Sequence, residues 1–223
     1  MDSYRRGFTL IELLAVVVLL LFLFLFAMLL PSLGPTHERS PRVMCVFNLK
    51  QDAIGLIMWS SDHQDQYPMA VPQAAGGTKE NTNGVDTYRH YLAISNVIQV
   101  PRTMVCPADK MRTVTTNFTQ FNNQHLSYFI DLDANPKAPR MFLAGDRHLT
   151  STNPPVSGVL NLSPGQKLGW TTQLHKAGVN GALTGGNVAF ADGHVSFCHD
   201  TNVTEAFRAS GDATNVWRLS LPE

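Results

Sequence analysis

The chain has 223 residues with 17 basic and 17 acidic side chains, so its formal net charge is zero. This balance argues against a nucleic-acid-binding protein, which would show a basic excess. Hydrophobic residues make up 44% of the chain. Many of them lie in one N-terminal segment, which leaves about 150–190 residues for one modest domain.

The first 30 residues carry the strongest signal in the chain. Residues 5–12 are Arg-Arg-Gly-Phe-Thr-Leu-Ile-Glu, and 18 residues without a charge follow them. A helix over residues 8–30 would reach about 34 Å at ~1.5 Å per residue, which exceeds the ~30 Å hydrocarbon core of a bilayer. The two arginines that precede it should stay in the cytoplasm by the positive-inside rule, which places the rest of the chain outside the cytoplasm.

Two ordinary explanations account less well for this segment. A cleaved secretory signal needs a shorter apolar region and a small-x-small cleavage site, whereas this run ends in Met-Leu-Leu-Pro-Ser-Leu at residues 28–33. A plain single-pass anchor gives no reason for Glu12, because an ionised group inside the bilayer costs roughly 2.5–3.5 kcal/mol or more. Glu12 therefore requires a partner.

Residues 7–12, Gly-Phe-Thr-Leu-Ile-Glu, resemble the class III signal of type IV prepilins and type II secretion pseudopilins. The resemblance implies that a prepilin peptidase cuts after Gly7 and that the new N-terminal residue, Phe8, is N-methylated. It also implies that Glu12 meets the free α-amine of Phe8 on a neighbouring subunit, where a low dielectric strengthens the attraction. A local alternative stays open, since Glu12 could instead bond the N-terminus of its own helix.

The N-terminal segment is expected to consist of a leader at residues 1–7 and a transmembrane helix at residues 8–30. Further segments follow it. Residues 31–41 hold three prolines and a glycine, so they should break the helix and form a hinge. Residues 42–66 are expected to form a stem helix with a closing polar loop. Its apolar side chains recur at i, i+3 and i+4, which predicts packing against a sheet. This stripe consists of Val43, Val46, Phe47, Ile54, Ile57 and Met58.

Residues 67–223 are predicted to form a small, mainly antiparallel β head in the periplasm. The whole chain is then α+β and pilin-like, with a transmembrane helix and an amphipathic stem helix packed on the head. Segments His125–Leu132 and Arg140–Ala144 have the pattern of core strands. Asp192-Gly193, between apolar residues, predicts a hairpin with a two-residue type I′ turn, which requires positive φ at both positions.

Several segments of the head resemble one large bacterial family of prepilin-like proteins. That family carries the methylation segment, a Cys-x-x-Asn-Leu-Lys-Gln helix, a Cys-Pro-x-Asp segment and a closing His…Asp-Gly-His-Val hairpin. The matching positions in this sequence are Cys45–Gln51, Cys106–Asp109, Ser127–Phe129, Gly145–Arg147 and Asn187–Val195. The closing motif here comprises His175, Asp192, Gly193 and His194, and its role is unknown. It departs from the family in spacing, because 16 residues separate His175 from Asp192 where the family has nine.

The chain contains three cysteines. An exported domain lies in an oxidising compartment, where disulfides form. Cys45 and Cys106 are the two that match the family motifs, and a bridge between them would tie the stem helix to the head and contribute about 4 kcal/mol on chain-entropy arguments. Buried free thiols are also common. Cys45 and Cys106 are therefore a candidate disulfide, with Cys198 expected to be free.

Histidines and acids in the C-terminal half suggest a catalytic or metal-binding hypothesis: His175, Asp192, His194, His199 and Asp200. Strand alternation limits which of them can meet, and the turn itself explains Asp192. The sequence has no His-Glu-x-x-His, paired Cys-x-x-Cys or nucleophile-elbow motif. We therefore interpret these residues as structural and assign no catalytic residue, no metal and no cofactor. Gly145-Asp146-Arg147 is likewise interpreted as a tight turn with a local ion pair.

The sequence thus predicts a pilin-like structural subunit, not an enzyme, that assembles into a type II secretion pseudopilus or a type IV pilus-like filament. Its expected partners are the prepilin peptidase, other pilin or pseudopilin subunits, an inner-membrane assembly platform and the lipid bilayer, with no nucleic acid. It should cross the bacterial inner membrane once, with a cytoplasmic N-terminus and a periplasmic head. The alternative is a membrane-tethered periplasmic hydrolase or a ligand- or metal-binding domain, with His175, His194 and Asp192 at its site.

Overall fold

The computed structural model describes residues 7, 9–29, 41–82, 85–152, 158–163, 165–171, 175–177, 183–210 and 217–222. The chain divides into two compact units, residues 1–40 and residues 41–223. The predicted leader apart from Gly7, the predicted N-terminal residue Phe8 and the hinge apart from Pro41 lie outside the described residues.

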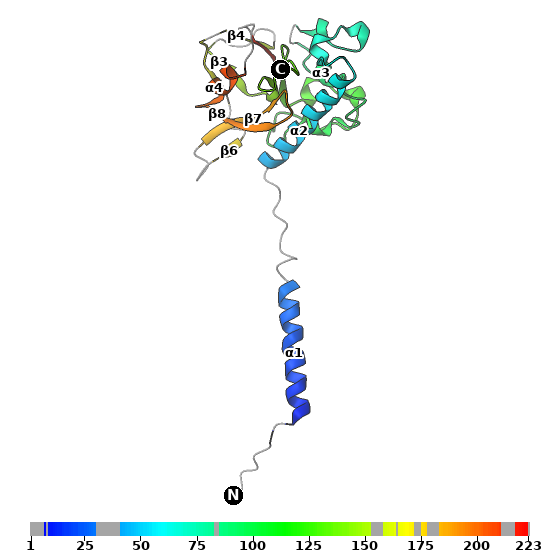
Figure 1. Ribbon diagram of the computed structural model, residues 1–223, viewed down its shortest axis with the longest axis vertical. Coiled ribbons are helices and arrows are strands. Elements are labelled where there is room, and N and C mark those ends of the chain that lie inside the picture. The colour runs from blue at the N-terminus through cyan, green and yellow to red at the C-terminus, as the bar shows by residue number, and fades with distance from the viewer. Residues whose placement is uncertain are drawn as a thin grey trace. The chain divides into compact units, whose positions relative to one another are not determined.

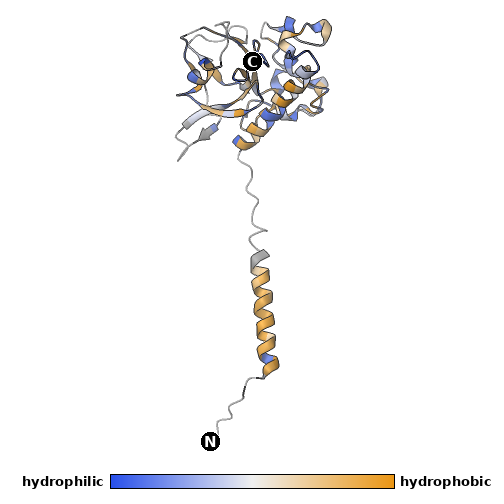
Figure 2. Cartoon of the chain, viewed as in Figure 1, coloured by the Kyte–Doolittle hydropathy of each residue, from blue (hydrophilic) through white to orange (hydrophobic). Residues whose placement is uncertain are grey.

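The first unit contains helix α1, Leu10–Leu29. Its side chains from Leu10 to Ala27 are exposed, and Figure 2 shows that it is hydrophobic along nearly its whole length. Among the described residues, α1 is the one helix that is long and apolar enough to cross a membrane. This helix is consistent with a single-pass membrane anchor.

Helix α2, Pro41–Ser61, opens the second unit and buries a different face from the one predicted. Leu49, Leu56 and Trp59 are buried, together with smaller or polar residues between them. Four members of the predicted stripe are instead 42 to 54% exposed: Val43, Phe47, Ile54 and Met58. The stripe assignment was wrong because α2 has two apolar faces. The buried face includes Cys45, Asp52, Ala53 and Gly55, whose small or polar side chains contribute little to a hydrophobic pattern.

The described strands form a seven-stranded antiparallel sheet and a separate pair, β3 and β5. In the large sheet the strands pair in the order β4-β9-β1-β2-β7. Strand β6 pairs with the same edge of β7 as β2 does, at a different position, and β8 pairs with the other edge. The α+β prediction is therefore confirmed. The strands of the large sheet are β1 Tyr128–Asp131, β2 Phe142–Asp146, β4 Val159–Leu162, β6 His175–Ala177, β7 Leu183–Phe190, β8 Val195–His199 and β9 Trp217–Ser220. The pair consists of β3 Leu149–Ser151 and β5 Leu168–Trp170.

Two hydrophobic clusters cover the two faces of the large sheet. Side chains alternate along a strand, so Tyr128 and Ile130 of β1 lie in one cluster with α2, and Phe129 lies in the other. The first cluster also includes residues from α3, Tyr88–Leu92, and from short 3₁₀ helices. The second cluster includes residues from α4, Val203–Arg208. Figure 1 shows α2 and α3 beside the sheet that carries β7 and β8. The 3₁₀ helices are Pro68–Ala70, Gln73–Ala75, Lys79–Asn81, Pro101–Met104, Phe118–Gln120 and Asn123–His125.

The hairpin of β7 and β8 has a three-residue loop, so the predicted two-residue type I′ turn was wrong. The Phe190 N–H donates to the His194 carbonyl at 2.9 Å, and the Gly193 N–H donates to the Phe190 carbonyl at 2.8 Å. Gly193 has φ of +83°, whereas Asp192 is not among the described residues with positive φ. This is a type I turn followed by a left-handed glycine, the usual geometry of a three-residue hairpin loop.

Candidate functional site

Glu12 caps the N-terminus of its own helix in the isolated chain. Its Oε2 accepts hydrogen bonds from the backbone N–H and from the Oγ1 of Thr9, each at 2.9 Å. Thr9 precedes the first helical residue, so the pair forms one half of a capping box. An anion in the first turn also meets the positive end of the helix dipole. Thr9 was missed as a functional residue, although the spacing Thr-x-x-Glu before an apolar run could have identified it.

Gly7 is exposed, and a β-carbon built there would have no described atom within 4 Å. Packing within the described chain therefore does not require a glycine at this position. Phe8, whose amine is the other predicted partner of Glu12, lies outside the described residues. The structure thus describes the local partner of Glu12 and not the intermolecular one.

A second group of predicted site residues meets inside the head. Cys45 of α2 and Cys106 are joined by a disulfide with a Cα–Cα distance of 4.9 Å, and both are fully buried. The bridge ties α2 to a loop 61 residues away in the sequence. Asn48, one turn along α2, supports the same contact, because its Nδ2 donates to the Val105 carbonyl at 3.0 Å. Cys198 is free and buried.

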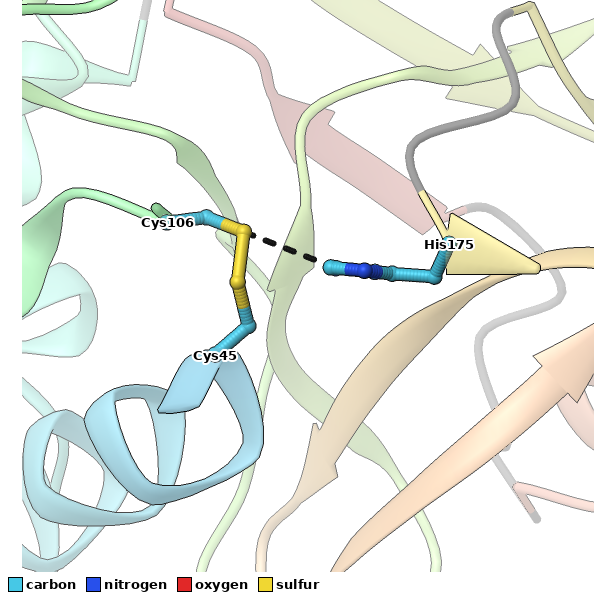
Figure 3. Close-up of side chains that lie close together, drawn as sticks. All are labelled: Cys45, Cys106 and His175. Atoms are coloured by element: carbon cyan, nitrogen blue, oxygen red, sulfur yellow. Dashed lines mark hydrogen bonds between the residues drawn. A yellow bond between two sulfur atoms is a disulfide. The ribbon is translucent and has the colours of Figure 1, made fainter. Parts of the chain in front are cut away.

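The sheet register brings His175 and Asp146 together beside this disulfide. Strands β2 and β6 pair with the same edge of β7 at different positions: Gly145 lies opposite Val188, and His175 lies opposite Gly185. The last residue of β2 therefore comes close to the first residue of β6. The His175 Nε2 lies 3.4 Å from Asp146 Oδ2 and 3.5 Å from Cys106 Sγ. Figure 3 shows the imidazole of His175 pointing at the disulfide.

Asp146 is held by Asn187 of β7. Its Oδ2 accepts from the Asn187 backbone N–H at 2.6 Å and from the Asn187 Nδ2 at 3.3 Å, while its Oδ1 is buried with no hydrogen-bond partner among the described residues. Burial raises the pKa of Asp146 to about 7. Burial, with Arg42 nearby, lowers the pKa of His175 to about 4. Both groups are thus shifted toward their neutral forms.

Arg147 does not pair with its neighbour Asp146, so the predicted tight turn with a local ion pair was wrong. Gly145 and Asp146 belong to strand β2. The Arg147 guanidinium instead binds Asp109 through two hydrogen bonds, of 2.7 and 3.2 Å. Burial opposes ionisation of Asp109, but the bonds and charge of Arg147 outweigh it and lower its pKa. A β-carbon on Gly145 would approach the Phe129 ring to 2.7 Å, which explains the glycine.

The remaining motif residues lie at the other end of β7. Asp192 Oδ1 accepts from the His194 backbone N–H at 3.0 Å and contacts its imidazole, and both side chains are over 40% exposed. His175 is paired near the start of β7, whereas Asp192 follows its end. The four residues of the closing motif therefore do not form one site. Asp200 is structural, because its carboxylate accepts from the Trp170 N–H and the Thr184 hydroxyl.

The comparison with protein families gives one match. The prokaryotic N-terminal methylation motif matches residues 2–28, which contain Gly7, Glu12 and most of α1. No curated protein and no solved structure matches the chain. This methylation motif, together with the apolar helix α1 that it largely contains, supports a prepilin-like protein.

Proposed function

We propose that this protein is a structural subunit that is cleaved after Gly7, N-methylated at Phe8 and assembled into a type II secretion pseudopilus or a type IV pilus-like filament. The observation that carries the proposal is the methylation motif at residues 2–28, which contains most of an apolar helix whose single charged residue is Glu12. An exposed glycine that no described packing requires is the expected feature of a peptidase site. The processing enzyme is a prepilin peptidase.

The proposed topology places the N-terminus in the cytoplasm and the head in the periplasm. Helix α1 is long enough for one crossing, and two arginines precede it in the sequence. The Cys45–Cys106 disulfide supports an oxidising compartment for the head. In this arrangement α1 anchors the subunit in the inner membrane until an assembly platform extracts it into the filament.

Assembly would exchange one partner of Glu12 for another. In the single chain the carboxylate accepts two hydrogen bonds from Thr9. Cleavage creates an α-amine at Phe8, and a charged donor gives a stronger hydrogen bond than a neutral one. In the low dielectric between packed apolar helices this attraction is stronger than in water. The amine of a neighbouring subunit would therefore draw Glu12 from its local cap and set the register between subunits.

Mass spectrometry of the N-terminus of the protein isolated from cells tests the proposal. We expect a chain that begins at N-methylated Phe8. The Gly7→Leu variant should keep its leader and fail to enter filaments, while Arg6→Lys, which retains the charge, should be processed as the parent is. A working protein that still begins at Met1 would contradict the proposal.

The competing hypothesis of a tethered hydrolase or binding domain required His175, Asp192 and His194 at one site. His175 pairs near the start of β7, whereas Asp192 and His194 follow the end of this strand, so the three residues do not form one site. The structural-subunit proposal does not depend on it.

A further inference from the structure

Four buried side chains of the head have no part in the proposed assembly. Cys45, Cys106 and Asp146 are fully buried, and His175 is 2% exposed. The two sulfur atoms and the His175 Nε2 all lie within 4.8 Å of one another. They come from α2, from the loop after Met104 and from β6, and Asp146 adds the end of β2. Figure 3 shows the bonded side chains of Cys45 and Cys106 with the imidazole of His175 pointing at them.

Two of the distances between these atoms match edges of a zinc coordination tetrahedron. Zinc binds sulfur at ~2.3 Å and nitrogen or oxygen at ~2.0–2.1 Å, so tetrahedral ligands should stand about 3.5 Å apart for nitrogen and sulfur and about 3.3 Å apart for nitrogen and oxygen. The His175 Nε2 lies 3.5 Å from Cys106 Sγ and 3.4 Å from Asp146 Oδ2. Both edges therefore have the required length while the sulfurs are still bonded to each other.

We propose that the dithiol form of this protein binds one zinc ion through Cys45, Cys106, His175 and Asp146. Reduction of the disulfide by a dithiol breaks the S–S bond. Two electrons and two protons pass to Cys45 and Cys106, and the reductant becomes a disulfide. Zinc then displaces a proton from each thiol, and both protons leave to solvent. The disulfide and the zinc site exclude each other, because both use the same two sulfur atoms.

The donor set selects the metal. Two thiolates and an imidazole suit zinc, whereas calcium and magnesium prefer oxygen ligands. A fourth protein ligand closes the coordination sphere, as in structural zinc sites. The carboxylate of Asp146 is already oriented by the backbone and side-chain N–H groups of Asn187, which act as the outer shell that fixes such ligands.

Zinc and the disulfide would serve as alternative cross-links of the same elements. The disulfide joins α2 to the loop that carries Cys106. Zinc would join these two segments and also fasten β2 and β6, through Asp146 and His175. A newly exported chain that still has two thiols could thus fold around zinc, and oxidation by a disulfide-bearing exchange protein would release the metal.

The test uses the full chain in detergent, reduced with a water-soluble phosphine and titrated with Co²⁺ or Zn²⁺. We expect one metal per reduced chain, a thiolate-to-cobalt charge-transfer band and the visible bands of tetrahedral cobalt. The oxidised chain should bind none. His175→Ala and Asp146→Ala should each weaken binding by at least about tenfold, as the loss of ligands and their supports does in zinc sites. His194→Ala and Cys198→Ser are matched controls that should bind as the parent does.

Two further measurements keep the outcome decisive. The oxidised His175→Ala variant should melt near the parent, which separates loss of a ligand from loss of the fold. In the reduced parent, one equivalent of zinc should slow alkylation of Cys45 and Cys106, mapped by mass spectrometry. A reduced chain that takes up no metal, or whose uptake is the same in His175→Ala, would overturn the proposal. Tetrahedral cobalt bands unchanged in Asp146→Ala would overturn the assignment of the fourth ligand.

Discussion

The two regions of this molecule for which we propose a function are encoded in opposite ways. The proposed processing and assembly segment is continuous, since Gly7, Phe8, Thr9 and Glu12 lie within six residues and would act through their order in the chain. The buried cluster of the head is discontinuous, since Cys45, Cys106, Asp146 and His175 meet only when a sheet has formed. A continuous site can be recognised before the fold is known, whereas a discontinuous one exists only within it. The following predictions test whether the two regions are separable in their effects.

The largest expected effect falls on the stability of the head. Cys106→Ser removes the bridge to Cys45, which spans 61 residues. The unfolding free energy of the oxidised protein should fall by about 4 kcal/mol, because the unfolded chain regains loop entropy. Denaturant unfolding of parent and variant measures this loss. Cys198→Ser is the control, since this cysteine is free.

Helix α1 should insert into the membrane equally well in both of these variants. It belongs to the other compact unit of the chain, and its apolar sequence is unchanged. A Cys106→Ser protein that is as stable as the parent would show that the bridge does not hold the head together.

The next effect falls on assembly and should leave the head untouched. Glu12→Ala removes a carboxylate that we expect to meet a charged amine, and hydrogen bonds to charged groups contribute about 1.5–3 kcal/mol. Filament incorporation should fall about 10- to 100-fold at each subunit contact, while membrane insertion and the melting temperature of the head stay the same. Quantitative recovery of filaments, with a membrane fraction as reference, measures this.

Glu12→Gln distinguishes the two partners of Glu12. Glutamine can accept the hydrogen bonds of Thr9 in a capping box as glutamate does. It cannot form an ion pair. If the Phe8 amine of a neighbouring subunit is the partner that matters, Glu12→Gln should assemble as poorly as Glu12→Ala. Parent-like filaments from Glu12→Gln would make the local cap the sole role.

The parts of the molecule that were predictable from the sequence are those set by local pattern. The methylation motif and the apolar helix depend on neighbouring residues, and both predictions are confirmed. The face of α2 was not predictable, because Cys45 and Ala53 are small and Asp52 is polar, yet the structure buries all three. Hydrophobic spacing alone favoured Phe47 and Met58, which lie outside the core.

The buried cluster was beyond prediction for a different reason. The proximity of His175 and Asp146 follows from two short strands sharing one edge of β7, with pairing positions that no local pattern specifies. A shift of one residue in either strand would turn its side chain to the opposite face of the sheet. Arg147 shows the same limit, because its partner Asp109 is remote in the sequence and its neighbour Asp146 is not its partner.

A moderate effect concerns pH and Asp52, a buried carboxyl group of α2. Burial raises its pKa to about 7, although a hydrogen bond from Thr103 Oγ1 at 2.7 Å opposes the shift. The folded protein then binds more protons than the unfolded chain between the unfolded pKa of about 3.9 and the folded value. Its contribution to stability is therefore fully present below about pH 4 and is lost as the pH rises toward 7, by at most about 1.4 kcal/mol per pH unit.

Asp52→Asn should remove this contribution and make the unfolding free energy less dependent on pH between 4 and 7. Denaturant unfolding at several pH values measures the slope. Asp62→Asn, just beyond the end of α2 and exposed, is the matched control and should keep the slope of the parent. An unchanged slope in Asp52→Asn would show that Asp52 is ionised in the folded head.

The smallest expected effect concerns the N-terminal segment. It tests whether the helix cap formed by Thr9 and Glu12 can be weakened without loss of assembly. Thr9→Ala removes the hydroxyl that donates to Glu12 but keeps the backbone N–H that also donates to it. Loss of a neutral hydrogen bond costs about 0.5–1.5 kcal/mol, so amide exchange in the first turn of α1 should accelerate about 2- to 10-fold. Thr9→Ser, which retains the hydroxyl, should exchange as the parent does. If Glu12 leaves the cap for a neighbouring amine, as we propose, Thr9→Ala should assemble nearly normally. An assembly defect as large as that of Glu12→Ala would mean that the cap persists within the filament.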